Sequence, residues 1–224
     1  MLPYGLKSLF GLNGKSVYKK KNGGCNMFSS FSKQFEEPAG LPGKIAGKIM
    51  SIENRSINKW TLDLLTLQDQ ECLLEVGYGP GFSIESAFAQ FPSLQLDGVD
   101  LSETMKQAAE RRNKELIEDK KVRLFVGDIA SFHIDKQYDK VFSVNNYPLW
   151  SDRKKGLLAI HTLMKKDGKV AITVQPREKD ADEGKTKQLA RTIRQDLEEA
   201  GFSGAAIHYK DAFPVLTVCV TAVK

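Results

Sequence analysis

Residues 73–82 read LLEVGYGPGF, in which a short apolar run leads into a loop with three glycines at alternate positions, Gly77, Gly79 and Gly81. An apolar run of this length bounded by glycines is typical of a buried β-strand. Glycine has no side chain, so the loop allows another group to approach the backbone closely. If a helix follows directly, its first N–H groups have no intrahelical partner and can bind an anion. The stretch therefore predicts a ligand site at the end of a strand.

Strands and helices alternate along the rest of the chain. Ile57, Trp60, Leu64 and Leu65 predict an amphipathic helix that ends near Leu67. Further strands are expected at 94–100, 122–128, 138–146, 170–176, 205–209 and 215–223. Helices are expected at about 82–91, 102–118 and 187–200. Another helix, which ends at the turn 165–169, is predicted by the apolar face of Leu157, Ile160, His161 and Met164. Ser102 is the expected N-cap of the 102–118 helix and Gly201 the C-cap of the last helix.

The nearly continuous apolar character of the strands favours an α/β protein whose parallel sheet is covered on both faces. The last two strands differ, because only residues 210–214 separate them. So short a connection cannot make a parallel crossover, and we expect the final strand to return antiparallel to its neighbour. Five strand–helix units followed by a hairpin are unusual for a dinucleotide-binding fold.

The glycine spacing also disfavours a dinucleotide site. The fingerprint G-x-G-x-x-G, counted from Gly77, requires its third glycine at position 82, where Phe82 stands. Glu75 followed by Gly77, Gly79 and Gly81 instead resembles the first motif of the class I S-adenosylmethionine-dependent methyltransferases, an acid followed by G-x-G-x-G. The terminal hairpin is also typical of that family, and the resemblance covers about residues 55–224.

The resemblance implies a Rossmann-like, doubly wound sheet of seven strands in the order 3-2-1-4-5-7-6, mostly parallel with an antiparallel last strand. It implies S-adenosylmethionine as cofactor. By resemblance, Asp100 at the end of GVD accepts hydrogen bonds from the two ribose hydroxyls, Asp128 in VGD takes the adenine amino group, and the Ile129 backbone meets the ring. The backbone at Asn145 and Asn146 would face the methionine end. The cofactor-binding set is Glu75, Gly77, Tyr78, Gly79, Gly81, Asp100, Leu101, Asp128, Ile129 and Asn145.

Two of these residues have a simpler interpretation. Asp100 could cap the helix that begins at Ser102, and Asp128 could serve only as a turn former. Glu75 is harder to explain in that way, because a carboxylate inside a buried strand is costly unless it is paired.

In-line methyl transfer to a small-molecule acceptor needs alignment more than a reactive side chain, and a general base only for a weakly acidic nucleophile. The sequence identifies no catalytic residue. Substrate contacts are expected from Tyr147, Trp150 and Gln175, which follow the fourth and fifth strands; Tyr147 and Trp150 suit a pocket wall or a core equally well. NNYP invites comparison with the N-P-P-Y motif of enzymes that methylate nucleic-acid amino groups, but Asn146 and Tyr147 occupy its two proline positions.

The positive charge of the chain is concentrated at one end. Residues 1–35 contain six lysines and no acid, which leaves −1 of the formal charge of +5 for residues 36–224. We expect a basic, flexible extension over 1–35 and a single methyltransferase domain over 36–224, with a helical cover at about 36–68. A transit peptide, or a natural start at Met27, remain alternatives for the first segment. The nearly neutral body favours a small molecule over nucleic acid, which requires a basic surface.

Neither a metal site nor a disulfide framework is predicted, because Cys25, Cys72 and Cys219 are far apart and the three histidines form no ligand spacing. No apolar run is long enough to cross a bilayer. The cysteine pattern fits a reducing compartment, and we expect a cytoplasmic enzyme. Two other classes remain open. One is a nicotinamide-dependent oxidoreductase, disfavoured by Phe82 and the closing hairpin. The other is a non-catalytic cofactor-binding or RNA-binding module, supported only by the lysine-rich segment.

Overall fold

The computed structural model describes residues 55–178 and 180–224. The predicted basic extension over 1–35, and most of the expected helical cover at 36–68, lie outside these residues. The rest of that cover is helical at 55–65, in agreement with the apolar pattern. Among the described residues, no helix combines the length and the apolar character needed to cross a membrane.

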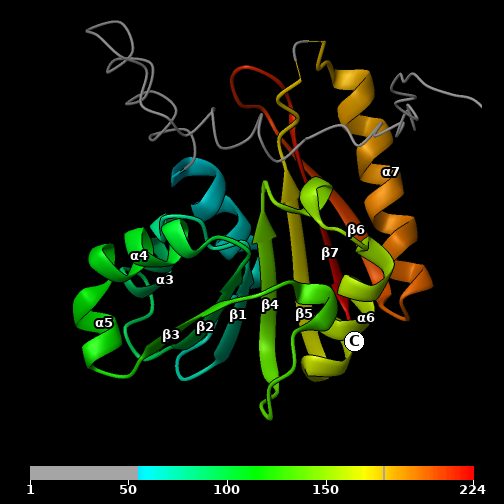
Figure 1. The fold of residues 1–224 in the computed structure, drawn as a ribbon. Helices are drawn as coiled ribbons and strands as arrows, with labels where there is room; N and C mark the ends of the chain where they lie inside the picture. The colour runs from blue at the N-terminus through cyan, green and yellow to red at the C-terminus, as the bar shows by residue number, and fades with distance from the viewer. Residues whose placement is uncertain (1–54, 179) are drawn as a thin grey trace, which may run out of the picture. The chain divides into compact units, whose positions relative to one another are not determined.

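The described chain is built on one sheet of seven strands (Figure 1). The strands are β1 (Cys72–Val76), β2 (Gln95–Asp100), β3 (Val122–Val126), β4 (Tyr138–Val144), β5 (Met164–Val174), β6 (Ser203–Lys210) and β7 (Thr217–Val223). Their order is β3-β2-β1-β4-β5-β7-β6. The first five strands are parallel to one another, and β7 is antiparallel to both β5 and β6. The predicted fold class and strand order are confirmed.

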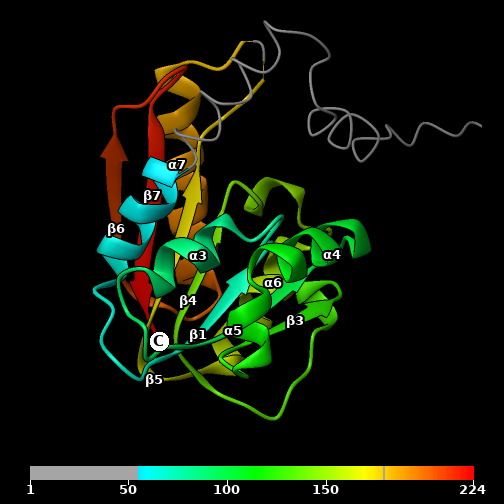
Figure 2. The same cartoon turned by 90° about the vertical axis from the view of Figure 1, so that its left-hand side faces the viewer.

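Helices cover both faces of the sheet (Figures 1 and 2). They are the 55–65 helix, α3 (Phe82–Phe88), α4 (Glu103–Arg112), α5 (Lys114–Glu118), α6 (Arg153–Leu163) and α7 (Glu183–Glu199), with short 3-10 turns η1 (Ile129–Ser131) and η2 (Tyr147–Leu149). Successive strand residues such as Leu73 and Leu74 are both fully buried, because they enter two separate cores. One core packs the sheet against α6 and α7, and the other against the 55–65 helix, α3 and α4.

The helix expected over 102–118 is interrupted at Asn113, so that α4 and α5 are separate. The Asn113 backbone has φ −112°, outside the helical range. Its side-chain amide donates to the carbonyl oxygens of Gly81 at 3.1 Å and Ala109 at 3.0 Å. The bond to Ala109 is a local side-chain bond of the kind that competes with the helix, and the bond to Gly81 fixes the break against the glycine loop. The start was predicted correctly, since Ser102 Oγ accepts from the backbone N–H of Met105.

The strand expected at 170–176 is longer and begins at Met164. Met164 is fully buried and pairs with Tyr138 at the start of β4, where the register shifts between Tyr138 and Lys140. The residues predicted as a turn therefore lie inside the strand. The last helix also begins earlier than predicted, at Glu183, because Asp182 Oδ1 accepts from the Lys185 N–H at 2.7 Å and caps it. Gly201, with φ +95°, follows the end of that helix as expected.

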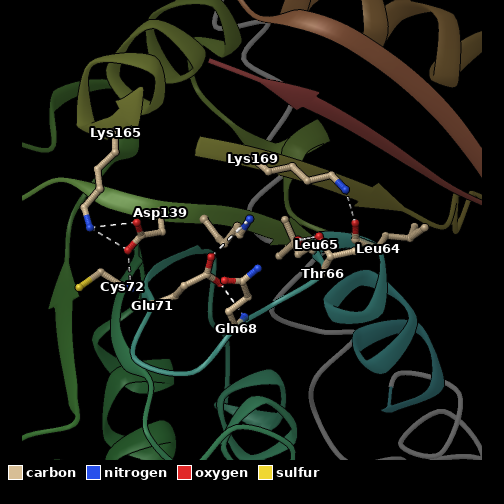
Figure 3. Close-up of polar contacts among 10 residues, drawn as sticks. Leu64, Leu65, Thr66, Gln68, Glu71, Cys72, Asp139, Lys165 and Lys169 are labelled. Carbon is tan, nitrogen blue, oxygen red and sulfur yellow. Dashed lines mark hydrogen bonds and ion pairs between the residues drawn. The ribbon is translucent and has the colours of Figure 1, made fainter. Parts of the chain in front are cut away.

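At the amino edge of the sheet, polar contacts bond the 55–65 helix to β5 and the start of β1 to β4 (Figure 3). The Lys169 ammonium donates to the Leu64 carbonyl at 2.6 Å, near the C-terminus of the helix. Asp139 accepts from the Cys72 backbone N–H at 2.8 Å and forms an ion pair with Lys165 at 2.9 Å. These contacts hold the framework together at the edge opposite the glycine loop.

Candidate functional site

The residues singled out in the sequence meet at the carboxyl edge of the sheet. The strands β3, β2, β1 and β4 are parallel neighbours, so the loops that follow them leave from the same edge. Backbone bonds continue between the strands at this edge, from Gly77 N to Val99 O at 2.7 Å and from Gly127 N to Asp100 O at 2.9 Å. Ligands of open α/β sheets bind at this edge, where the strand order reverses.

The three glycines of the loop after β1 have positive φ values, but the space beside them differs. A Cβ on Gly77 would lie 2.1 Å from Cγ of Asn146, and one on Gly81 would lie 2.4 Å from Nδ2 of Asn113. Both glycines are therefore needed for packing within the protein. Among the residues that the structure describes, a Cβ on Gly79 would meet nothing within 4 Å. The open space over this loop is at Gly79.

Asp100 is fixed beside that space. Its Oδ2 accepts from the backbone N–H of Gly79 at 2.9 Å, and its Oδ1 accepts from the N–H of Ser102 at 2.9 Å. An ionised carboxylate has about four acceptor positions, so each oxygen keeps one free. Partial burial raises the pKa of Asp100 above its usual value, against the opposing effect of the two N–H groups. The carboxylate is thus held in one orientation with acceptor capacity to spare.

Glu75 is the buried acid of this site, with an exposed fraction of 2%. The Ser83 hydroxyl at the start of α3 donates to its Oε1. Its Oε2 is buried and has no hydrogen-bond partner among the described residues. Burial raises the pKa of Glu75 to about 8, with Ser83 opposing and the charge of Asp100 adding to the rise. An unpartnered buried carboxylate oxygen is costly, so this position suits a cationic or proton-donating ligand group.

Asp128 and Ile129 lie at the end of β3, where η1 begins. Asp128 Oδ1 accepts from the Ala130 N–H at 2.9 Å, and its Oδ2 accepts from the Ser151 hydroxyl at 2.5 Å. Asp128 is therefore a turn former here, as the simpler interpretation held. Each oxygen again keeps acceptor capacity, so a further ligand contact is compatible with this role. Ile129 is buried in the core below α6.

Leu101 and Tyr78 occupy opposite environments. Leu101 follows Asp100 and is 49% exposed, which leaves an apolar side chain at the tip of β2. Tyr78 is buried, its hydroxyl donates to the Phe125 carbonyl, and its ring fills the place of a side chain on Gly98. Tyr78 contributes only its backbone to the glycine loop.

Asn145 and Asn146 follow β4 and both have structural partners. Asn145 has φ +54°, and its Oδ1 accepts from the backbone N–H of Gln175 at 2.7 Å. Asn146 Oδ1 accepts from Trp150 Nε1 at 2.7 Å, which holds the side chain that packs on Gly77. These bonds determine the shape of the loop end that packs against Gly77 of the glycine loop.

Tyr147 and Trp150 are both core residues. Their rings meet at 5.0 Å in an edge-to-face contact, and the Tyr147 hydroxyl donates to Asp196 of α7 at 2.5 Å. Of the two interpretations left open, the structure places both in the core. Gln175 is 3% exposed, and its side-chain amide donates to the carbonyls of Phe213 and Val215, both at 3.0 Å. The Gln175 side chain is therefore engaged within the protein, and its contact with substrate stays a prediction.

Sequence reasoning missed three residues that shape the site: Ser83, Asn113 and Ser151. Each bonds to a residue that was singled out, namely Glu75, Gly81 and Asp128. Ser83 carried the one usable signal, because a small hydroxyl in the first turn of the helix lies near the strand that precedes the loop. The other two are more than twenty residues away along the chain, and the sequence pattern does not reveal such contacts.

Residues 73–168 match the family model described as a methyltransferase domain. The protein named "Uncharacterized methyltransferase YdaC" from Bacillus subtilis (strain 168) is 42% identical over 181 residues, which are 80% of this chain and 98% of that protein. Identity at this level over nearly the whole relative shows the family.

Solved structures share the fold. A S-adenosylmethionine-dependent methyltransferase from Aquifex aeolicus aligns with a TM-score of 0.62 and 18% identity over 79% of this chain and 97% of that one. The phosphoethanolamine N-methyltransferase 2 of Haemonchus contortus, solved with phosphomonomethylethanolamine and S-adenosylhomocysteine, aligns with a TM-score of 0.60 and 19% identity over 75% of this chain and 52% of that one. The alignment thus spans about half of the Haemonchus protein. Together with the family match, these findings show that the chain belongs to the class I S-adenosylmethionine-dependent methyltransferases.

Proposed function

We propose that this methyltransferase transfers the methyl group of S-adenosylmethionine to a small-molecule acceptor at the carboxyl edge of the sheet. One observation carries the placement of the cofactor: Gly79 has open space beside it, and the carboxylate of Asp100 is fixed at that space by the Gly79 N–H. A side chain at Gly79 would fill this space, and the residues around it fit the group that the family binds.

Each part of the cofactor finds a chemically suitable residue. The free acceptor positions of Asp100 suit the two ribose hydroxyls, since each oxygen can accept one of them. The unpartnered Oε2 of Glu75 suits the ammonium group of the methionine end, directly or through water, because that positive charge would oppose the burial that raises the pKa of Glu75 and so favour the carboxylate. The exposed Leu101 side chain offers an apolar surface to the nucleoside, and Asp128 and the Ile129 backbone suit the edge of adenine.

The sulfonium of the bound cofactor supplies an electrophilic methyl group, and the protein has to align an acceptor with it. Asp100, the glycine loop and the loop end at Asn145 are each fixed by hydrogen bonds within the protein. Such pre-alignment can account for roughly 7 to 11 kcal/mol of barrier reduction when two reactants are held in line. Positioning and exclusion of water are the contributions that we assign to this chain.

A small molecule is favoured as acceptor by the charge of the domain. Residues 36–224 carry a formal charge of −1, whereas nucleic-acid binding depends on lysines and arginines that neutralise several phosphates. Many of the lysines on the described surface are also paired with acids, such as Lys106 with Glu110 and Lys187 with Glu183.

The test is incubation of the purified protein with methyl-tritiated S-adenosylmethionine and a fractionated cell extract. We expect label to appear in a small-molecule product. Label confined to nucleic acid or to protein would contradict the proposed acceptor class, and no label in any fraction would contradict the proposed transfer. The Asp100→Ala variant is the matched control, since its weaker cofactor binding should lower the labelling at subsaturating S-adenosylmethionine.

A further inference from the structure

Phe213 is the most exposed large apolar side chain in the described part of the chain, with an exposed fraction of 73%. It lies in the loop of residues 211–216 between β6 and β7. Because β7 runs antiparallel to β5 and Val218 pairs with Val174, this loop lies at the carboxyl edge of the sheet (Figure 1). The aromatic side chain is therefore at the same edge as the glycine loop.

The backbone that carries Phe213 is held firmly. The buried amide of Gln175 donates to the carbonyls of Phe213 and Val215, and the Thr186 hydroxyl of α7 donates to the Leu216 carbonyl at 3.2 Å. A buried side chain that satisfies two loop carbonyls fixes the loop, because a shift would leave polar groups without partners. Phe213 is thus an exposed ring on a preorganised backbone, so binding has to order its side-chain torsions but not the loop.

Gln175, which holds the 211–216 loop, is also bonded to the end of β4. The backbone N–H of Gln175 donates to Asn145 Oδ1, so Asn145, Gln175 and the 211–216 loop form one hydrogen-bonded series along the edge. The proposed cofactor position occupies the ends of β1, β2 and β3, and its methionine end reaches Asn145 after β4. An acceptor in line with the methyl group has to approach from the remaining part of the edge, over β4, β5 and β7.

We propose that Phe213 is a specificity-determining residue that packs against the apolar body of the methyl acceptor, an aromatic ring or an acyl chain. The inference rests on the proposed function, because it assigns the acceptor side of the same site. Aromatic rings pack well on one another and on aliphatic chains. A contact of this kind discriminates between acceptors by their apolar area and leaves cofactor binding unchanged.

The experiment measures initial rates with methyl-tritiated S-adenosylmethionine and an ultrafiltered small-molecule extract at a series of dilutions. Wild type, Phe213→Ala, Phe213→Tyr and Leu158→Ala are compared. Leu158 is the matched control, an apolar side chain on α6 that is 45% exposed. We expect Phe213→Ala to raise the apparent KM for the acceptor about tenfold, the lower range for a lost apolar contact. Phe213→Tyr should restore most of the affinity, and Leu158→Ala should behave as wild type.

Two further measurements separate the outcomes. Calorimetric titration with S-adenosylhomocysteine should give the same Kd for wild type and Phe213→Ala, and the labelled product should be retained on a reversed-phase column. If wild type forms product and Phe213→Ala has the same KM, or if that substitution changes only the oligomeric state, the inference is overturned while the proposed function stands. If wild type forms no labelled product, the proposed function itself fails and the inference fails with it.

Discussion

The backbone N–H of Gly79 donates to Oδ2 of Asp100 over 2.9 Å, so the loop after β1 is bonded to the carboxylate at the tip of β2. The two residues are 21 positions apart in sequence. Their bond places the most open point of the glycine loop next to the carboxylate that has free acceptor positions. The account of cofactor binding depends on this pair.

Replacing Asp100 by alanine should weaken the affinity for S-adenosylhomocysteine by about 1.5 to 3 kcal/mol, because a charged acceptor for two hydroxyls is lost. Isothermal titration calorimetry measures the change. Asp100→Asn keeps one acceptor oxygen and should fall between wild type and alanine. An unaltered Kd in the alanine variant would count against the placement of the ribose.

Gly79→Ala and Gly77→Ala should separate binding from stability. A Cβ on Gly79 meets open space, so the cost to folding should be limited to the strain of φ +50°, about 1 to 2 kcal/mol, while cofactor binding is lost. A Cβ on Gly77 overlaps the Asn146 side chain and should destabilise the fold more strongly. Urea denaturation and calorimetry of both variants check this. If both variants lose the same stability and Gly79→Ala still binds the cofactor, the proposal that the cofactor lies against Gly79 is refuted.

The buried Glu75 should make stability depend on pH. Burial raises its pKa to about 8 from an ordinary value of 4.5, so between these values the folded state holds a proton that the unfolded state has released. The free energy of unfolding should therefore fall as the pH rises from about 4.5 to about 8, and this contribution is lost above the folded pKa. Glu75→Gln cannot titrate and should lack this slope.

The difference between wild type and Glu75→Gln isolates Glu75, because other acids such as Asp97 and Asp139 have lowered pKa values and act in the opposite sense in both proteins. Urea denaturation at several pH values gives both curves. Parallel curves for the two proteins would show that Glu75 is ionised in the folded state throughout this range.

Lys169→Met should lower stability by about 1 to 2 kcal/mol, because it removes the cation bonded to the Leu64 carbonyl near the end of the 55–65 helix. Methionine keeps the apolar stem of the lysine. Lys59→Met is the control, since it removes an exposed pair with Asp63, and such pairs contribute little. Urea midpoints compare the two. A loss for Lys59→Met as large as that for Lys169→Met would contradict the capping role.

Tyr147→Phe should destabilise the fold by about 1 kcal/mol and leave the affinity for S-adenosylhomocysteine unchanged, because its hydroxyl bonds to the half-buried Asp196 of α7. Denaturation and calorimetry on the same sample check both statements. If the variant has normal stability but binds S-adenosylhomocysteine more weakly, Tyr147 contributes to the cofactor site and the prediction is wrong.

The fold was predictable because its signals are local. Apolar runs, Ser102 as a cap, and the short link between β6 and β7 each act within a few residues. The glycine motif likewise marked the edge at which the site residues meet. The break at Asn113 was not predictable, since its cause is a contact with Gly81 from a distant part of the chain. Burial of Tyr147 and Trp150 was also undetermined, because an aromatic after a strand suits a wall or a core until the neighbouring helices are in place.

The most direct test of the central claim is a crystal structure of the protein with S-adenosylhomocysteine. The account predicts the two ribose hydroxyls within hydrogen-bond distance of Oδ1 and Oδ2 of Asp100, with the nucleoside against the backbone at Gly79. A complex in which the nucleoside lies away from Asp100, with the space over Gly79 unfilled, would contradict it.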